Sequence, residues 1–212
     1  MSYLSKHFLV WIVIILHVVG AVCTIIPYTK ELVQPLTPIN LLISTFLIIS
    51  VRRGSWSKFI TFLLTAFVIG FLVEVIGVKT GYPFGDYSYG RTLGWKLFDV
   101  PLIIGVNWFL LSYAFGTITN RFNTSQYVKI IVAALSMVCL DFLIEPVAIT
   151  LDFWSWAGDE IPLQNYFSWF VIALIIQVFF QSFLSNETND LSIPMVFSQV
   201  FYFFFVYISL YF

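Results

Sequence analysis

Charged residues and histidines are scarce in this chain of 212 residues. Only 10% of the residues are charged, whereas 60% are hydrophobic. A soluble domain of this length needs more polar surface than that, but a bundle of helices in lipid does not. The ten Lys and Arg are scattered over several loops and are balanced by eleven Asp and Glu. The composition therefore predicts an integral protein of the lipid bilayer, with no basic surface for nucleic acid.

Several kinds of site are missing as well. The two histidines, His7 and His17, are too few for a membrane di-iron oxygenase, and His17 is expected to be a packing residue. There is no Gly-x-Gly-x-x-Gly turn and no Walker loop, so neither a dinucleotide nor ATP is indicated. The last apolar run has no lysine to carry retinal. Cys23 and Cys139 lie within apolar runs and imply no disulfide framework. We predict no metal ion and no cofactor.

Seven apolar runs can be counted against a hydrocarbon core of about 30 Å. They are continuous and do not alternate with period two, so helices are expected and not a β-barrel. The first run exceeds the apolar region of a signal peptide and no Ala-x-Ala site follows, so we expect a retained helix. The connections are too short for a second folded unit. The fold class is therefore all-α, a polytopic membrane bundle of about seven transmembrane helices in a single domain, residues 1–212. The predicted spans are 8–26, 38–51, 59–78, 100–119, 127–150, 166–184 and 193–212.

Basic residues indicate the orientation of this bundle. Loops on the side of the N-terminus hold six of them and loops on the opposite side hold four, which favours a cytoplasmic N-terminus. We predict a multi-pass protein of the cell (inner) membrane whose C-terminus faces outward. The first set is Lys6, Arg52, Arg53, Lys58, Arg121 and Lys129, and the second is Lys30, Lys79, Arg91 and Lys96.

Two acidic residues, Asp141 and Glu145, interrupt the fifth apolar run. Four residues are slightly more than one helical turn, so both carboxyl groups lie on one face of the helix. An ionisable side chain is costly at membrane depth, and such residues usually mark a functional site. The alternative is that the pair makes polar contacts between helices.

Alternating helix directions place three more residues near this pair. Glu74 lies about one turn from the end of the third run, and Asn107 and Trp108 lie about two turns from the start of the fourth. All of them fall in the same half of the bundle as Asp141 and Glu145. This convergence predicts a pocket that opens to one face of the membrane.

Two aromatic loops lie over the same face. Loop 79–90 contains three glycines and a proline, which favour tight turns, and loop 152–162 contains two tryptophans separated by one residue. Tryptophan and tyrosine also collect at membrane interfaces in general, which is the alternative explanation. Their number beside buried acids favours a substrate pocket. The residues expected to line it are Trp108, Tyr82, Phe84, Tyr87, Tyr89, Trp154, Trp156 and Asn165.

This inventory permits acid–base chemistry on an apolar, lipid-dissolved substrate. A carboxylic acid in a low-dielectric site resists ionisation, and a second carboxylate nearby adds to this, so the pair can hold a proton near neutrality. Protonation of a terminal isopropylidene group gives a tertiary carbocation, which carboxylates and aromatic faces stabilise. Capture of water yields a tertiary alcohol, and capture by another double bond yields a ring. Prenyl transfer with Mg²⁺ also stays open, through Lys79, Arg91 and Lys96.

A set of residues between about 70 and 170 carries a family resemblance. Its most specific part is the loop Thr-Gly-x-Pro-Phe-Gly-x-Tyr-x-Tyr, which begins at Thr80. The full set is Glu74, Gly77, Thr80, Gly81, Pro83, Phe84, Gly85, Tyr87, Tyr89, Leu93, Gly94, Lys96, Pro101, Trp108, Asp141, Pro146, Trp154, Trp156, Gly158, Ile161, Pro162, Asn165 and Trp169. It resembles the integral-membrane carotenoid hydratase family, which includes bacterial carotenoid 1,2-hydratases and archaeal bisanhydrobacterioruberin hydratases. The resemblance implies addition of water to the terminal double bond of an acyclic carotenoid in carotenoid biosynthesis, without a redox cofactor.

We therefore expect a hydro-lyase that acts on water and a lycopene- or γ-carotene-like acyclic carotenoid. In this hypothesis Asp141 donates the proton, while Glu145 and Glu74 tune it, stabilise the cation or activate water. Asn107 positions that water. Two other functions stay open: a carotenoid end-group cyclase, which would exclude water, and a non-enzymatic carotenoid-binding or transport protein.

Overall fold

The structure is a computed structural model that describes residues 3–211. Seven helical stretches in this part of the chain are long and apolar enough to cross a membrane. Six of them match the predicted spans to within a few residues, and the second begins at Pro27 and not at residue 38. The predicted all-α membrane bundle is confirmed. The helices are α1 (Tyr3–Ile25), α2 (Pro27–Val33), α3 (Thr37–Ser50), α4 (Trp56–Thr80), α5 (Leu102–Thr119), α6 (Gln126–Thr150), α7 (Leu163–Leu184) and α8 (Ser192–Tyr211), with 3-10 turns at Gln34–Leu36 and Ala157–Asp159.

Local sequence explains where several of these helices begin. Pro27 and Pro38 lie in the first two positions of α2 and α3, where a residue without an N–H group leaves no helical hydrogen bond unmade. At the start of α6 the hydroxyl group of Ser125 accepts a hydrogen bond from the backbone N–H of Val128 at 3.4 Å. The second predicted span thus starts from a short helix and a 3-10 turn that the sequence analysis did not predict.

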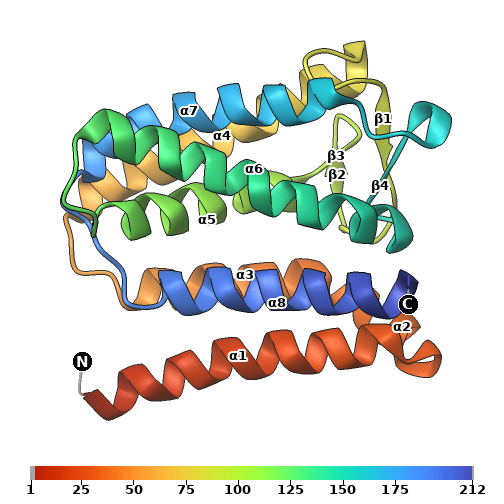
Figure 1. Ribbon diagram of the computed structural model, residues 1–212, viewed down its shortest axis with the longest axis horizontal. Coiled ribbons are helices and arrows are strands. Elements are labelled where there is room, and N and C mark those ends of the chain that lie inside the picture. Colours follow the sequence, from red (N-terminus) through yellow and green to blue (C-terminus); the bar gives the residue numbers. More distant parts are fainter. Residues whose placement is uncertain (1–2, 212) are drawn as a thin grey trace.

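The helices form two layers (Figure 1). α4, α5, α6 and α7 pack against one another as a four-helix bundle. α1, α3 and α8 form a second layer, which lies below that bundle in the view of Figure 1. The layers meet where α8 packs on α5 and α6, and where α3 packs on α5. The boundary between the layers is important for the site described below.

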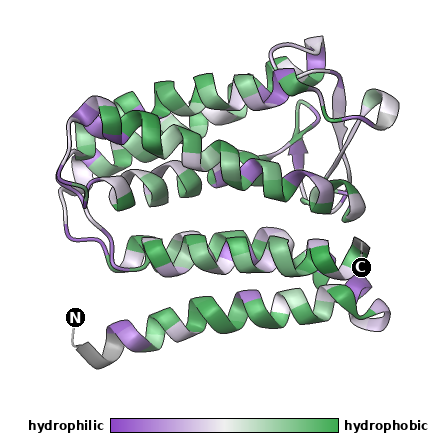
Figure 2. Cartoon of the chain, in the orientation of Figure 1, coloured by the Kyte–Doolittle hydropathy of each residue, from purple (hydrophilic) through white to green (hydrophobic). Residues whose placement is uncertain are grey.

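Hydrophobic residues cover the outside of both layers. Figure 2 shows hydrophobic residues along the helices and hydrophilic residues gathered mainly at the helix ends and connections. Large apolar side chains such as Phe46, Leu64 and Phe197 are exposed on the helix surfaces. Apolar side chains that no other part of the protein covers are suited to contact with lipid tails. The chain is therefore a multi-pass membrane protein.

Two small antiparallel ribbons join loops that the sequence analysis left without strands. β1 (Tyr87–Tyr89) pairs with β4 (Trp154–Trp156), and β2 (Lys96–Leu97) pairs with β3 (Val100–Pro101). In the first ribbon Ser88 lies opposite Ser155, and both serines are exposed. Because side chains alternate between the faces of a strand, the aromatic residues on either side of each serine point toward the bundle.

Two glycines of α4 allow the neighbouring elements to approach it. A Cβ atom on Gly70 would lie 2.3 Å from Cγ of Trp108, closer than real Cβ contacts come. A Cβ atom on Gly77 would lie 2.7 Å from the hydroxyl oxygen of Tyr87 and 2.9 Å from the ring of Phe84. Glycine at these two positions therefore lets α5 and the loop that leads into β1 pack directly on α4.

Candidate functional site

Glu74 of α4 is the first of three buried carboxylates near the end of the bundle that carries β1. Its Oε2 accepts hydrogen bonds from the hydroxyl groups of Tyr87 and Tyr89, the second at 2.7 Å. Its Oε1 accepts a hydrogen bond from Nε1 of Trp108 at 3.0 Å. The side chain is 4% exposed. Glu74 thus joins α4 to β1 and α5 through uncharged donors.

Glu145 of α6 also has three uncharged donors. Nε1 of Trp154 and Nε1 of Trp156 both donate to its Oε2 at 2.9 Å. Nδ2 of Asn165 in α7 donates to its Oε1 at 2.9 Å. The two indoles come from β4, which pairs with β1. One face of this ribbon therefore supplies phenol donors to Glu74 and indole donors to Glu145.

Asp141 lies one turn before Glu145 on α6 and is 1% exposed. Nδ2 of Asn165 lies 3.3 Å from its Oδ2, so one amide bridges Asp141 and Glu145. Oδ1 of Asp141 is buried and has no hydrogen-bond partner within the described chain. Asp141 is therefore the carboxyl group of the three that has the least support for a negative charge.

Among the described residues, no basic side chain forms an ion pair with these carboxylates. The ion pairs among the described residues all involve other acids, namely Asp99, Glu187 and Asp190. Burial, followed by the charge of Glu74, raises the pKa of Tyr87 and of Tyr89 above the ordinary value, so both phenols stay protonated and act as donors. The site is thus rich in carboxyl groups and in neutral donors.

A small cavity of about 30 Å³ opens between these side chains. A water molecule needs roughly 10–15 Å³ of such volume, so the cavity has room for one or two water molecules. Glu74, Glu145 and Asn107 are among its lining residues. Its other lining residues are Phe84, Tyr87, Tyr89, Ile104, Trp108, Trp154, Trp156, Asn165 and Trp169.

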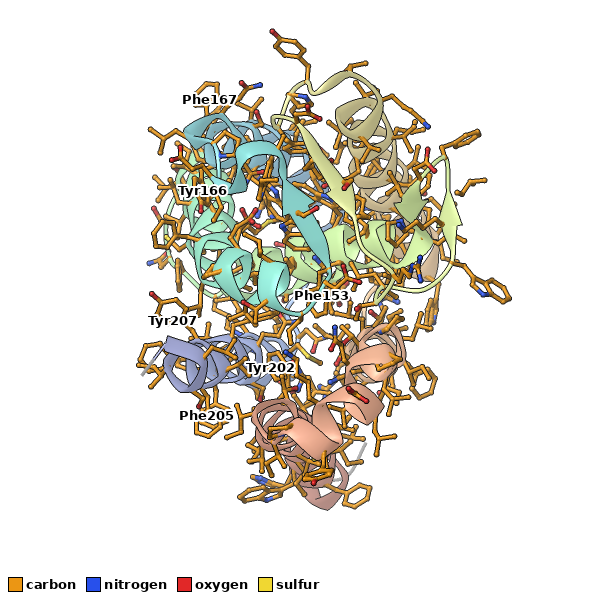
Figure 3. The ribbon with its side chains drawn as sticks, turned by 90° about the vertical axis from the view of Figure 1, so that its right-hand side faces the viewer. Phe153, Tyr166, Phe167, Tyr202, Phe205 and Tyr207 are labelled. Carbon is orange, nitrogen blue, oxygen red and sulfur yellow. The ribbon has the colours of Figure 1, made fainter. Side chains whose placement is uncertain are left out.

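A larger, mostly apolar groove of about 300 Å³ lies beside this cavity, between the two layers of helices. Its lining includes Phe153, which follows α6, and Tyr202 of α8. Figure 3 looks at the end of the molecule that carries the strands and shows Phe153 at the lower edge of the four-helix bundle, above Tyr202. Ile104, Asn107 and Trp154 line both spaces, so the groove and the water-sized cavity adjoin.

Asn107 stands at this junction with a free amide group. The amide makes no hydrogen bond to any other described residue, and Asn107 lines the cavity on one side and the groove on the other. An unpartnered amide at such a boundary offers both a donor and an acceptor to a water molecule or a substrate.

The sequence of the chain matches a known protein family. The profile of a family described as "Carotenoid biosynthesis protein" matches residues 36–212. This chain belongs to that family. The family match covers α3 to α8 and therefore contains all three carboxylates, both strands of the aromatic ribbon and most of the groove.

One relative of this chain has a named activity. The chain is 29% identical over 117 residues to a bisanhydrobacterioruberin hydratase from Haloarcula japonica. The match covers 51% of this chain and 40% of the relative, so the chain spans less than half of the relative's length. No solved structure matches the chain. The comparisons thus relate this family member to a carotenoid hydratase.

In this family member, most residues predicted for the site lie together. Three of the four predicted catalytic residues line the small cavity, and Asp141 lies behind it, bridged to Glu145 by Asn165. Tyr82 is the exception among the predicted lining residues, because its side chain is 72% exposed. The predicted residues that line the cavity are Glu74, Glu145, Asn107, Trp108, Phe84, Tyr87, Tyr89, Trp154, Trp156 and Asn165.

Trp169 lines the cavity but was absent from the predicted lining set. Its ring stacks on that of Trp108, with 4.0 Å between the ring centroids. Trp169 lies four residues after Asn165, about one turn along α7, so the helical period places both on the same face. The four-residue spacing from Asn165 is therefore the sequence signal that predicts Trp169 as a lining residue.

The basic residues considered for a diphosphate site lie outside both spaces. Lys79 forms an exposed ion pair with Asp99, and Nζ of Lys96 donates to the backbone carbonyl of Tyr89. Neither lysine, nor Arg91, lines the cavity or the groove. Within residues 3–211 no group of three His, Cys, Asp or Glu side chains is arranged to hold a metal ion.

Proposed function

We propose that this protein adds water across the terminal, 1,2-position C=C bond of an acyclic carotenoid end group and forms a tertiary alcohol. The observation that supports this is the adjacency of two unlike spaces. A water-sized cavity with carboxyl groups adjoins an apolar groove, and the two share Asn107 and Trp154. Hydration of an alkene needs this combination, because its two substrates differ completely in polarity.

The groove is suited to the hydrocarbon substrate, a lycopene- or γ-carotene-like polyene. Its volume of about 300 Å³ lies within the usual range of ligand sites, and it is mostly apolar. In the proposed complex the polyene lies between the layers and its terminal double bond reaches the junction at Asn107. The reacting bond is then next to Trp154 and the carboxyl groups.

The carboxyl pair on α6 supplies the proton. Asp141 has one long contact to Asn165 and a buried oxygen without a partner, whereas three donors stabilise a negative charge on Glu145. We therefore assign the shared proton to Asp141. Glu145 lines the cavity and faces the reacting end, so the pair acts as one unit in the transfer.

The remaining steps use the other residues of the cavity. Transfer of the proton to the terminal C=C bond leaves a tertiary carbocation, which the carboxylates stabilise by charge and the indole rings by cation–π attraction. A water molecule held by Asn107 and Glu74 forms the new C–O bond. Its surplus proton returns to the carboxyl pair, so the net change is the addition of one water molecule.

The proposal includes an orientation in the membrane. We infer that the protein lies in the cell (inner) membrane with its N-terminus in the cytoplasm, because six of the ten basic residues lie on that side. The ribbon and the acid site then belong to the outer half of the bilayer.

Expression in a host that accumulates lycopene tests the function. The expected product is heavier by one water molecule per reacted end, and its new oxygen comes from heavy-oxygen water and not from heavy oxygen gas. A ring without a change of mass would make the protein a cyclase. Unchanged pigment that co-purifies with the protein would make it a binding protein. Either of these two results overturns the proposal.

A further inference from the structure

Two polar side chains in the wall of the groove have no part in the proposed hydration. His17 of α1 and Gln199 of α8 both line the groove, and each is 5% exposed. Both helices belong to the second layer, whereas the carboxyl groups belong to the four-helix bundle. A buried polar group whose hydrogen-bonding capacity is not fully used is unfavourable in an apolar wall, so the presence of these two side chains requires an explanation.

The packing of α1 on α8 places these two residues at the same depth. A Cβ atom on Gly20 would lie 3.6 Å from the ring of Tyr202, and the hydroxyl group of Tyr202 lies 3.1 Å from Oγ1 of Thr24. The two helices run in the same direction (Figure 1). Three residues earlier on each helix lie His17 and Gln199, so they face the groove at one level.

The hydrogen-bonding capacity of the two side chains is unused on the groove side. Nδ1 of His17 lies 2.8 Å from the backbone oxygen of Val13. A carbonyl oxygen only accepts, so Nδ1 carries the hydrogen, and the neutral ring presents Nε2 as an acceptor. The amide of Gln199 has no hydrogen bond to another described residue, and its Oε1 is buried. The pair therefore offers acceptors and one amide donor.

A hydroxyl group matches this set of donors and acceptors. Its O–H group donates to Nε2 of His17 or to Oε1 of Gln199, and its oxygen accepts a hydrogen bond from the Nε2 amide of Gln199. We propose that His17 and Gln199 form a hydroxyl-binding subsite that selects carotenoids already carrying an alcohol group on the segment in the groove. This inference rests on the proposed function in one respect, namely that the groove holds the carotenoid.

Equilibrium binding to the purified full chain tests the subsite without any turnover. The probes are two acyclic carotenoids that differ by a single hydroxyl group, and the readout is quenching of tryptophan fluorescence. We expect the wild type to bind the alcohol about three- to tenfold more tightly, as one net hydrogen bond predicts. In Gln199→Leu this preference disappears, while the affinity for the hydrocarbon is unchanged or higher.

Two further variants separate the subsite from general packing. His17→Phe keeps a ring in the wall and is expected to lose the preference as well, which covers the case in which Gln199→Leu does not fold. Ser198→Ala changes a neighbouring buried polar residue that does not line the groove, so the preference stays. The inference is overturned if the wild type shows no preference for the alcohol. It is also overturned if Gln199→Leu lowers the affinity for both carotenoids equally, as the loss of a bound water molecule would.

The result for the subsite is distinguishable from the result for the proposed function. A preference for the alcohol that depends on Gln199, in a protein that adds no water to any pigment, supports the subsite and contradicts the hydration. Hydration of the hydrocarbon and the alcohol at equal rates and equal affinities contradicts the subsite alone.

Discussion

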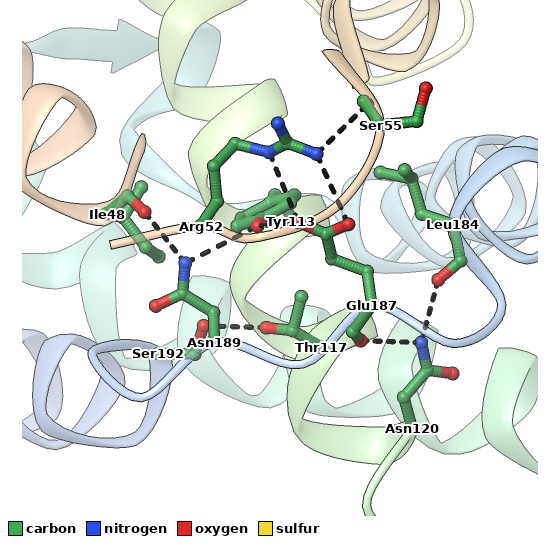
Figure 4. Close-up of polar contacts among 10 residues, drawn as sticks. All are labelled: Ile48, Arg52, Ser55, Tyr113, Thr117, Asn120, Leu184, Glu187, Asn189 and Ser192. Carbon is green, nitrogen blue, oxygen red and sulfur yellow. Dashed lines mark hydrogen bonds and ion pairs between the residues drawn. The ribbon is translucent and has the colours of Figure 1, made fainter. Parts of the chain in front are cut away.

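Two buried polar clusters lie at opposite ends of the four-helix bundle, and they handle charge differently. At the start of α4, Arg52 donates to Glu187 from Nε at 3.1 Å and from Nη2 at 3.3 Å (Figure 4). Tyr113 donates to the same carboxylate at 3.0 Å. Near the other end of α4, Glu74 has only neutral donors. One cluster is a compensated ion pair and the other is a set of acids without a cation.

The compensated cluster has the features of a structural connection. Its guanidinium group also donates to the backbone oxygen of Ser55 and lies over the rings of Trp56 and Phe59. The cluster joins the loop before α4 to the loop before α8 (Figure 4). The acid cluster instead surrounds a cavity. The protein thus pairs its buried charges in the structural cluster at the start of α4. It leaves the acids without a cation around the cavity, where we propose chemistry.

The largest expected effect comes from Asp141→Asn, which removes the proton that we assign to this group. The shape of the side chain is kept, so the protein is expected to stay folded and assembled in the membrane. Turnover of the carotenoid is expected to fall by about 10²- to 10⁴-fold, the usual contribution of a general acid. Product formation in isolated membranes and thermal unfolding in detergent measure the two quantities. Wild-type turnover in this variant would contradict the assignment to Asp141 and would indicate that Glu145 or Glu74 donates the proton.

Glu187→Gln is the matched change in the compensated cluster and should have the opposite pattern. It leaves the buried guanidinium of Arg52 without its counter-charge, which costs about 3–5 kcal/mol of stability. Turnover per folded molecule is expected to be unchanged, because the cluster lies away from the cavity. A loss of turnover without a loss of stability would show that the two clusters are coupled and do not have separate roles.

The smallest effect concerns the donors on the ribbon. Trp156→Phe keeps an aromatic ring but removes one of the three hydrogen bonds to Glu145. We expect turnover to fall by about ten- to a hundredfold, since a hydrogen bond to a charged group contributes roughly 1.5–3 kcal/mol. Ser155→Ala, the neighbouring change on the outward face, is the control and should alter neither turnover nor stability by more than about 0.5 kcal/mol. Equal changes of turnover in the two variants would mean that the ribbon covers the cavity but does not act through its hydrogen bonds to Glu145.

The sequence was sufficient for the membrane spans and for the half of the bundle in which the polar residues meet. Both depend on local quantities, the length of an apolar run and the rise of a helix per residue. Glu74, Asn107 and Glu145 were placed together on this basis, and in the structure they line one cavity. Their chemical roles stay predictions, because position alone does not identify which group carries the proton.

The ribbon and Arg52–Glu187 were not predicted, for physical reasons that differ. Strands of three residues are too short to give a clear period-two signal, although Tyr-Ser-Tyr and Trp-Ser-Trp contain the alternation. The exposure of Tyr82 depends on the direction of the turn before β1, which the count of aromatic residues does not specify. The partners Arg52 and Glu187 are 135 residues apart, and only tertiary packing brings such residues together.

The positions of the donors along the chain have a consequence for biosynthesis. Glu74 receives its phenols from residues 13 and 15 positions later, and Glu145 receives its indoles from residues 9 and 11 positions later. Each acid is thus followed, in the order of translation, by the groups that solvate it. A nascent chain can therefore supply these donors to either carboxylate from the loop that follows its helix, before the rest of the protein has left the ribosome.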